Sequence, residues 1–209
     1  MELEERKVLV SGVLINYVRY GKGACNILCM PGSLGTWETD FKEILSKFDP
    51  DRYTVVVWDP PGYGKSRPYN LVYNKYYNRD QAPIAAALMK KLSLCPFSML
   101  GWSEGGRTAF HVADQFPDLV HKLVVWGAGH IMNDELKILF TMMRDPLDWP
   151  QTATREALEK VYGISYLRKT WSALCDFYVR HVLHPTANHN VHLQHPDRFL
   201  DIVEKFLTE

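Results

Sequence analysis

Apolar residues fall into short continuous runs over the first 130 positions of the chain, and each run leads into a turn or a helical pattern. Short β-branched runs that alternate with helical patterns predict a mostly parallel sheet with helices on both faces. The expected strands occupy residues 7–10, 14–19, 26–30, 53–58, 97–101 and 122–126. The first two form an antiparallel pair, and the next three are apolar throughout, which is typical of strands covered on both faces.

Helical patterns separate these strands and then dominate the rest of the chain. Helices are expected over residues 38–48, 76–92 and 105–116, with Pro83 marking either a kink or a late start. After Gly129 the pattern predicts helices over residues 134–144, 154–162 and 166–182 with no strand between them. We therefore predict one domain over residues 1–209 with a small helical cap at about 130–182. A last amphipathic helix is expected over 197–207, with Phe199, Val203 and Phe206 on one side.

The sequence Gly-Trp-Ser-Glu-Gly at residues 101–105 lies between an expected strand and an expected helix. This is the context in which a G-x-S-x-G turn projects the serine hydroxyl from the carboxyl edge of a sheet, as a nucleophile elbow. Ser103 is therefore the candidate nucleophile. The alternative is a chance match to the pattern in an ordinary strand-to-helix turn.

A serine hydroxyl needs a base, and the oxyanion that its attack creates needs hydrogen-bond donors. The backbone N–H of Glu104 is the expected first donor, and Ser33 or Leu34, in the turn after residues 26–30, is expected to supply the second. On such folds the histidine follows the nucleophile and the acid in the chain. His189, just before the last helix, is the candidate base.

Histidines are frequent in this part of the chain, at His181, His184, His189, His192 and His195. A zinc site is the alternative interpretation, but cysteine or acidic partners at ligand spacing are missing from the sequence. We predict no metal and no cofactor, and interpret most of these histidines as surface residues.

The composition is that of an ordinary soluble globular protein, with 46% apolar and 23% charged residues. The 24 basic side chains balance 24 acidic ones, which gives no electrostatic footprint for nucleic acid or an anionic membrane. Four scattered cysteines favour a reducing compartment without disulfides. The acidic N-terminus shows no signal or transit features, so the sequence predicts a cytoplasmic address.

Several motifs taken together resemble one family. They are Pro-Gly-Ser-Leu-Gly at 31–35, Glu-Thr-Asp-Phe at 38–41, Trp-Asp-Pro-Pro-Gly-Tyr-Gly-Lys-Ser-Arg-Pro at 58–68, Gly-Trp-Ser-Glu-Gly-Gly at 101–106, Val-Trp-Gly-Ala at 125–128 and His-Asn-Val-His-Leu at 189–193. The set closely resembles the valacyclovir hydrolase family, also called biphenyl hydrolase-like proteins, over nearly the whole chain. The resemblance implies an α/β-hydrolase fold and a serine esterase, with Ser103 as nucleophile and His189 as base. Family members are associated with mitochondria, which gives a second expected address.

The resemblance also implies a substrate class, the esters of α-amino acids. In the family an Asp follows the nucleophile, and its carboxylate pairs with the α-ammonium group of the substrate. Glu104 keeps this charge and adds one methylene, so a charge-assisted contact requires a pocket that accepts the longer side chain. The alternative is a solvent-facing Glu in the first turn of a helix, where the helix dipole favours it.

The chain departs from the family before its histidine segment. A piece the size of a βαβ unit, roughly 30 or more residues, is missing there, so the sheet is expected to lack its last two strands. No Gly-x-x-Asp turn follows an apolar strand between Gly129 and His189, and the triad acid has no counterpart. Asp134 is the candidate replacement, with Glu135 and Asp176 as alternatives. Loss of the acid in a comparable triad cost ~10⁴ in turnover.

Two functions therefore stand at this stage. The first is a serine esterase that acts on a small-molecule ester and is impaired by loss of the triad acid. In this interpretation the chain is a shortened gene product or splice form. The second is a catalytically silent hydrolase-fold protein that binds an amino-bearing ligand or a partner chain. Without the last strands, the strand that ends at Trp126 becomes an open edge. A monomer or an edge-mediated dimer is expected.

Overall fold

The computed structural model describes residues 3–129 and 134–180, together with Asp197, Leu200, Val203, Glu204 and Leu207. The chain divides into two compact units. The sheet unit comprises Met1–Leu71, Asn78–Ala128 and Asn188–Glu209, and the helical unit comprises Val72–Tyr77 and Gly129–Ala187. Each unit is described by itself.

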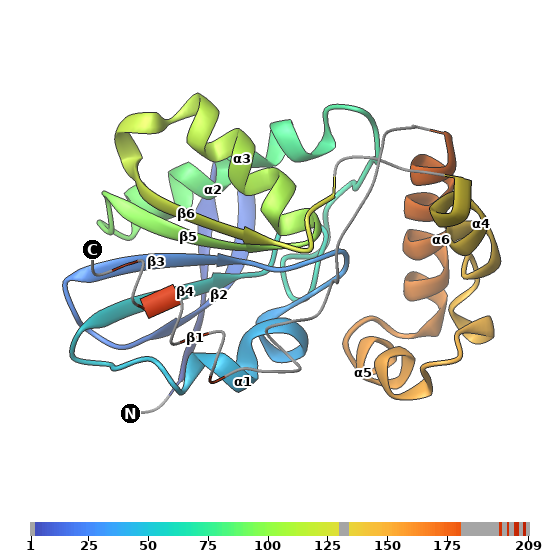
Figure 1. The fold of residues 1–209 in the computed structure, drawn as a ribbon, viewed down its shortest axis with the longest axis horizontal. Helices are drawn as coiled ribbons and strands as arrows, with labels where there is room; N and C mark the ends of the chain where they lie inside the picture. Colours follow the sequence, from blue (N-terminus) through green and yellow to red (C-terminus); the bar gives the residue numbers. More distant parts are fainter. Residues whose placement is uncertain are drawn as a thin grey trace. The chain divides into compact units, whose positions relative to one another are not determined.

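The sheet unit is built on a six-stranded sheet in the order β1-β2-β4-β3-β5-β6 (Figure 1). The strands are β1 (Glu4–Val10), β2 (Val13–Tyr20), β3 (Cys25–Met30), β4 (Tyr53–Trp58), β5 (Phe97–Trp102) and β6 (Val120–Trp126). β1 pairs antiparallel with β2, and β2 with β4. The pairs β3/β4, β3/β5 and β5/β6 are parallel. The predicted mostly parallel sheet, with its opening antiparallel pair, is confirmed.

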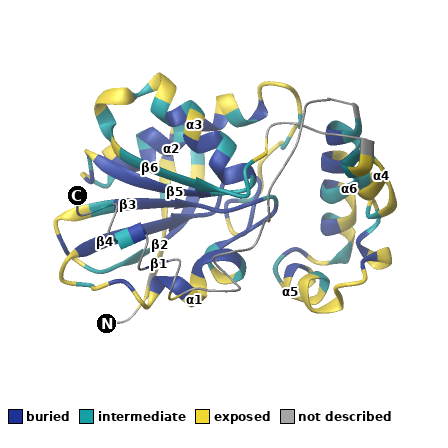
Figure 2. Ribbon diagram, in the orientation of Figure 1, coloured by how far each residue is buried: buried dark blue, intermediate teal, exposed yellow. Residues whose placement is uncertain are grey.

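Both faces of the sheet are covered, because side chains alternate between two apolar clusters along each strand. Leu28 and Met30 pack with residues of α2 (Tyr77–Lys91) and α3 (Glu104–Gln115), whereas Ile27 and Cys29 pack with α1 (Lys42–Leu45). Figure 1 shows α2 and α3 on one face and α1 on the other. The central strands are accordingly buried, as Figure 2 shows. This two-sided burial explains why their sequences are apolar throughout.

The segment expected as one helix over 38–48 is shorter and less regular. A π-helical turn at Trp37–Phe41 precedes α1, which covers only Lys42–Leu45. The side chains of Thr36 and Thr39 exchange hydrogen bonds with each other's backbone N–H groups in a capping box at the start of the turn. The wider turn allows two consecutive side chains, Asp40 and Phe41, to be buried together.

α2 continues through Pro83, so the late start that this proline suggested is wrong. Proline has no N–H to donate to the carbonyl four residues earlier, which here belongs to Arg79. That oxygen instead accepts a 3.3 Å hydrogen bond from Nε2 of Gln115 on α3. The helix therefore tolerates the proline because a neighbouring side chain replaces the lost donor.

β6 is the outermost strand of the sheet formed by the described residues, and most of its side chains are only partly buried. Of the expected last helix, the five described residues are helical. Leu200 and Val203 are buried in the cluster on the α1 face, and Asp197 forms an ion pair with Lys47. Phe199 and Phe206 lie outside the described residues.

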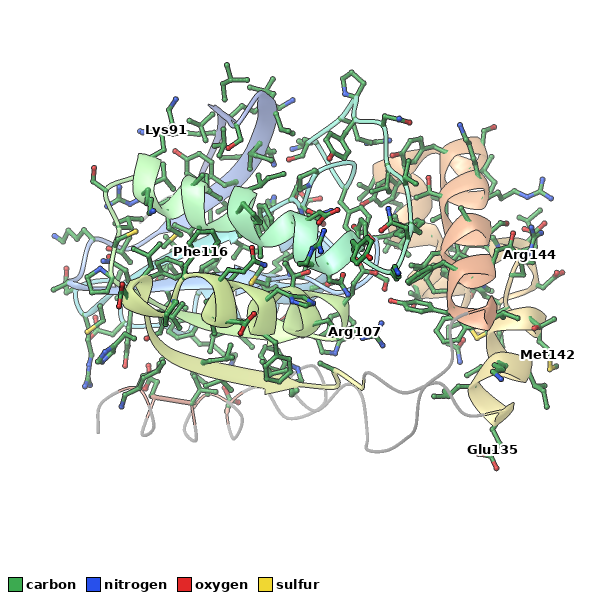
Figure 3. The ribbon with its side chains drawn as sticks, turned by 90° about the horizontal axis from the view of Figure 1, so that it is seen from above. Lys91, Arg107, Phe116, Glu135, Met142 and Arg144 are labelled. Atoms are coloured by element: carbon green, nitrogen blue, oxygen red, sulfur yellow. The ribbon has the colours of Figure 1, made fainter. Side chains whose placement is uncertain are left out.

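The helical unit contains α4 (Asp134–Met142), α5 (Thr152–Tyr162) and α6 (Ile164–Arg180). Within the described part of the unit no strand interrupts them, as expected for residues 134–180. Arg144, which follows α4 and is labelled in Figure 3, lies beside α6. Its guanidinium forms a two-pronged ion pair with Asp176 of that helix. Tyr73 packs its ring against Phe177 with centroids 6.5 Å apart. None of the helices in the described residues is both long and apolar enough to cross a membrane.

Candidate active site

Ser103 occupies a strained backbone position between the end of β5 and the start of α3. Its φ is 54° and its ψ is −119°, outside the regions that residues with a side chain usually adopt. Such strain persists only where the surrounding structure enforces it, and it is concentrated at functional sites. The conformation is the sharp strand-to-helix turn that the nucleophile-elbow hypothesis requires.

Two glycines make this turn sterically feasible. A Cβ on Gly101 would lie 2.7 Å from Cα of Gly106, and a Cβ on Gly105 would lie 2.1 Å from the backbone oxygen of Met30. Neither position has room for a side chain. The first turn of α3 therefore packs directly against the ends of β3 and β5.

The backbone of the elbow is also tied to β6. The N–H of Ser103 donates a 3.0 Å hydrogen bond to the carbonyl oxygen of Trp126, the last residue of that strand. This donor is committed to the sheet. The N–H of Ser103 is therefore not the donor on which the expected oxyanion site depends.

The turn after β3 lies beside the elbow. The N–H of Gly35 donates to the carbonyl oxygen of Gly32, which places Ser33 and Leu34 at the centre of the turn. A Cβ on Gly32 would lie 3.3 Å from Cβ of Ser103. Leu34 has a φ of 57°, a second strained position within this small region. The structure thus brings together the expected nucleophile and both candidates for the second oxyanion donor.

Glu104 does not face solvent, since only 4% of its surface is exposed. Its Oε2 accepts a 2.8 Å hydrogen bond from the hydroxyl of Ser33, and its Oε1 accepts one of the same length from the hydroxyl of Tyr63. The interpretation as a solvated helix-dipole residue is therefore wrong. A carboxylate buried next to the candidate nucleophile and held by two hydroxyls is a candidate binding group for a cation.

Three residues of the region escaped the sequence analysis as functional candidates, although the family motifs contain all of them. Tyr63 reaches Glu104 from the turn after β4. Asp40 accepts the N–H of Gly32, and Asp59 accepts the N–H of Lys65. For Asp40 and Asp59 the sequence did carry a signal, an acid within an apolar stretch. Such an acid is expected to be buried, and a buried carboxylate needs specific hydrogen-bond partners.

The residues of this candidate site lie within the range of a known protein-family profile. The family profile described as alpha/beta hydrolase fold matches residues 26–170. The chain belongs to the α/β-hydrolase family.

Two curated α/β-hydrolase relatives carry the name "Serine hydrolase BPHL". The protein of Mus musculus is 34% identical and that of Homo sapiens 33% identical, each over 96% of this chain and 85% of the relative. This confirms the family resemblance that the motifs indicated. Both alignments are 249 residues long and this chain has 209, so at least 40 aligned positions lack a residue of this chain.

Solved structures agree on the α/β-hydrolase fold. A serine hydrolase involved in carbazole degradation, the CarC enzyme, superposes with a TM-score of 0.73 at 17% identity and covers 99% of both chains. The epoxide hydrolase VrEH1 of Vigna radiata superposes with a TM-score of 0.64 at 12% identity, over 85% of this chain and 72% of its own. At these identities the likeness concerns the fold alone.

The remaining predicted members of the hydrolase site are only partly described. His189, and with it His181, His184, His192 and His195, lies outside the described residues. Asp134 is the first residue of α4, and its side chain also lies outside the description. Glu135 is exposed, and the carboxylate of Asp176 is engaged by Arg144. Within residues 3–129 and 134–180, no three potential metal-ligating side chains cluster.

Proposed function

We propose that this α/β-hydrolase is a serine esterase that hydrolyses esters of α-amino acids. The observation that carries the proposal is the arrangement around Ser103. A strained serine follows β5, a turn with two candidate donors lies beside it, and a buried carboxylate comes next in the chain. The relatives named serine hydrolases support the reaction class.

In the proposed reaction, Oγ of Ser103 attacks the ester carbonyl carbon while His189 takes the hydroxyl proton. The carbonyl oxygen becomes an oxyanion that accepts hydrogen bonds from the N–H of Glu104 and from Ser33 or Leu34. The tetrahedral species collapses, and the alcohol leaves with the proton from His189. A water molecule, activated by the same histidine, then releases the amino acid from Ser103.

Glu104 gives the proposal its substrate class. Its carboxylate comes from the residue after the nucleophile, so a cation that it binds lies close to the reacting carbonyl, as the α-ammonium group of an amino acid ester does. Hydrogen bonds between an ammonium and a carboxylate are about twice as strong as neutral ones. The hydroxyls of Ser33 and Tyr63 orient the carboxylate before substrate arrives. The family has the shorter Asp at this position. The two hydrogen bonds support a pocket that accepts the longer Glu104 side chain.

The missing triad acid limits the expected rate. Asp134 is our proposed replacement, because it lies in the segment after β6, the strand whose end is bonded to Ser103. Without a carboxylate that orients the histidine, turnover falls by ~10⁴ in a comparable enzyme. We therefore propose a slow esterase in which Asp134→Asn lowers turnover further.

Covalent labelling tests the proposal directly. A fluorophosphonate probe is expected to label the folded protein, and Ser103→Ala is expected to abolish the label. Absence of labelling in protein with a native circular dichroism spectrum would refute the enzyme and favour the silent binding protein.

The substrate class has its own test. The p-nitrophenyl ester of valine is compared with the same ester carrying an N-acetyl group, which removes the positive charge. The wild type should prefer the free amine, and Glu104→Gln should reduce that preference by about 10- to 100-fold in kcat/KM. Equal preference in both proteins would reject Glu104 as the ammonium ligand.

A further inference from the structure

Asp40 is a buried acid that takes no part in the reaction steps above. It belongs to the π-helical turn before α1 and is 6% exposed. Its Oδ2 accepts a 2.8 Å hydrogen bond from the N–H of Gly32, and its Oδ1 accepts a 2.7 Å hydrogen bond from the hydroxyl of Thr39. Both carboxylate oxygens are therefore engaged by neighbouring groups.

The Gly32–Gly35 turn wraps around this carboxylate. Gly32 begins the turn and donates its N–H to Asp40. Gly35 ends the turn, and a Cβ there would lie 1.8 Å from Oδ2 of Asp40. Asp40 thus touches the turn at both ends, while Ser33 and Leu34 lie between them.

The position of this turn matters because Gly32 also packs on the elbow. A Cβ on Gly32 would lie 2.8 Å from Cε3 of Trp102 and 3.3 Å from Cβ of Ser103. Oxyanion donors act only when they lie about 2.7–3.1 Å from the oxyanion, and a misplacement of about 1 Å can cost 10²-fold in rate. A group that fixes Gly32 therefore fixes the second oxyanion donor relative to Ser103.

We infer that Asp40 is a positioning residue for the reaction, which holds the Gly32–Gly35 turn where it can donate to the oxyanion at Ser103. The inference rests on the proposed esterase activity. Asp40 acts through the N–H of Gly32 and does not touch the substrate.

The energetics of Asp40 are those of a buried acid held by the turn. Burial of a carboxylate is costly unless hydrogen bonds compensate, and here the compensating bonds come from Gly32 and Thr39. Burial raises the pKa of Asp40 to about 7, the nearby Asp59 adds to the increase, and the bonds from Thr39 and Gly32 oppose it. A residue kept at this cost is explained by the N–H that it orients.

Two substitutions with a matched control test the inference. Asp40→Leu keeps the branched shape with two larger methyl groups and removes the acceptor, whereas Asp40→Asn keeps one oxygen that can accept from Gly32. Asp51→Asn, at an exposed aspartate paired with Lys22 before β4, is the control. The measurements are kcat and KM for the valine p-nitrophenyl ester and the rate of fluorophosphonate labelling.

Asp40→Leu should lower kcat and the labelling rate by 10-fold or more while KM stays within about 3-fold. Asp40→Asn should bring both back to about 2- to 3-fold below wild type, and Asp51→Asn should match wild type. A purely structural residue would instead leave the kcat of the folded fraction unchanged. Folded Asp40→Leu with wild-type kcat would overturn the inference.

The controls separate this inference from the proposed function. If wild-type protein is folded but unlabelled, the esterase proposal fails before Asp40 is tested. If Asp40→Leu does not fold, Asp40→Asn alone decides the matter. Its amide presents one oxygen to two donors, so kcat should fall about 2- to 3-fold at unchanged KM. An unchanged kcat, or a fall matched by a rise in KM, would contradict the positioning role.

Discussion

The hydroxyl of Tyr63 donates a 2.8 Å hydrogen bond to Oε1 of Glu104, across 41 positions of sequence. Tyr63 lies in the turn after β4, and Glu104 begins α3. The bond joins the segment after β4 to the segment after β5, and the side chain of Tyr63 is fully buried. It fixes the direction of the carboxylate that we propose as the ammonium ligand.

Tyr63→Phe should therefore weaken selection of charged substrates without abolishing catalysis. We expect the preference for the free-amine ester over its N-acetyl analogue to fall about 3- to 10-fold, which corresponds to the net value of one ordinary hydrogen bond, because the bond orients the carboxylate and does not itself contact the substrate. The N-acetyl ester should be hydrolysed at the wild-type rate. The control is Tyr69→Phe, since Tyr69 is 40% exposed. An equal loss for both esters would mean that Tyr63 supports only the fold.

Strain at Ser103 predicts an opposition between stability and activity. Ser103→Gly and Ser103→Ala both remove the nucleophile, but only glycine adopts a φ of 54° without cost. A strained backbone costs about 1–3 kcal/mol, and the extra freedom of glycine in the unfolded chain offsets part of this. Ser103→Gly should be about 1 kcal/mol more stable than Ser103→Ala in urea denaturation. Equal stabilities would argue against strain at the elbow.

Gly105 provides a test of the packing at the elbow. In Gly105→Ala the new Cβ would lie 2.1 Å from the backbone oxygen of Met30, which cannot move aside as a flexible side chain could. We expect a loss of about 2–3 kcal/mol in stability and loss of fluorophosphonate labelling. Gly129→Ala meets no atom within 4 Å and should stay within about 0.5 kcal/mol of wild type. The idea is rejected if the two variants unfold at the same urea concentration.

The buried acid Asp40 predicts a particular pH dependence of stability. Its pKa rises from 3.8 to about 7 on folding, mainly by burial, so between these values the folded state holds a proton that the unfolded state has released. The contribution of Asp40 to stability therefore declines as pH rises from about 4 to 7 and is level above that. Burial raises the pKa of Asp59 to about 6, with Glu5 adding to the increase and Lys65 opposing it, and Asp59 acts in the same direction.

Asp40→Asn isolates this contribution, because every other titrating group is kept. The Tm of the variant minus that of the wild type should become more positive as the pH is raised from 4 to 8. Calorimetry at five pH values across that range is the measurement. A difference that does not change with pH would show that Asp40 does not titrate in the window.

The sequence was most informative where local rules suffice. The strands, their two-sided burial and the turn at Ser103 follow from apolar runs that end in glycine-rich segments, and the structure confirms them. The segment 38–48 was predicted less well, because a π-helical turn buries Asp40 beside Phe41 and no helical periodicity indicates this. The partners of Glu104 could not be predicted either, since Ser33 and Tyr63 are brought to it only by the pairing of β3, β4 and β5.

The hydrogen bond from Ser103 to Trp126 has a consequence for how such proteins can vary. Ser103 is anchored to β6 at the last residue of that strand, before the chain leaves the sheet unit at Ala128. Insertions, deletions or exchanged modules after this point need not displace the serine, because its anchor precedes them. Evolution can thus lengthen, shorten or replace the downstream chain, and so change what reaches the serine, without rebuilding the elbow.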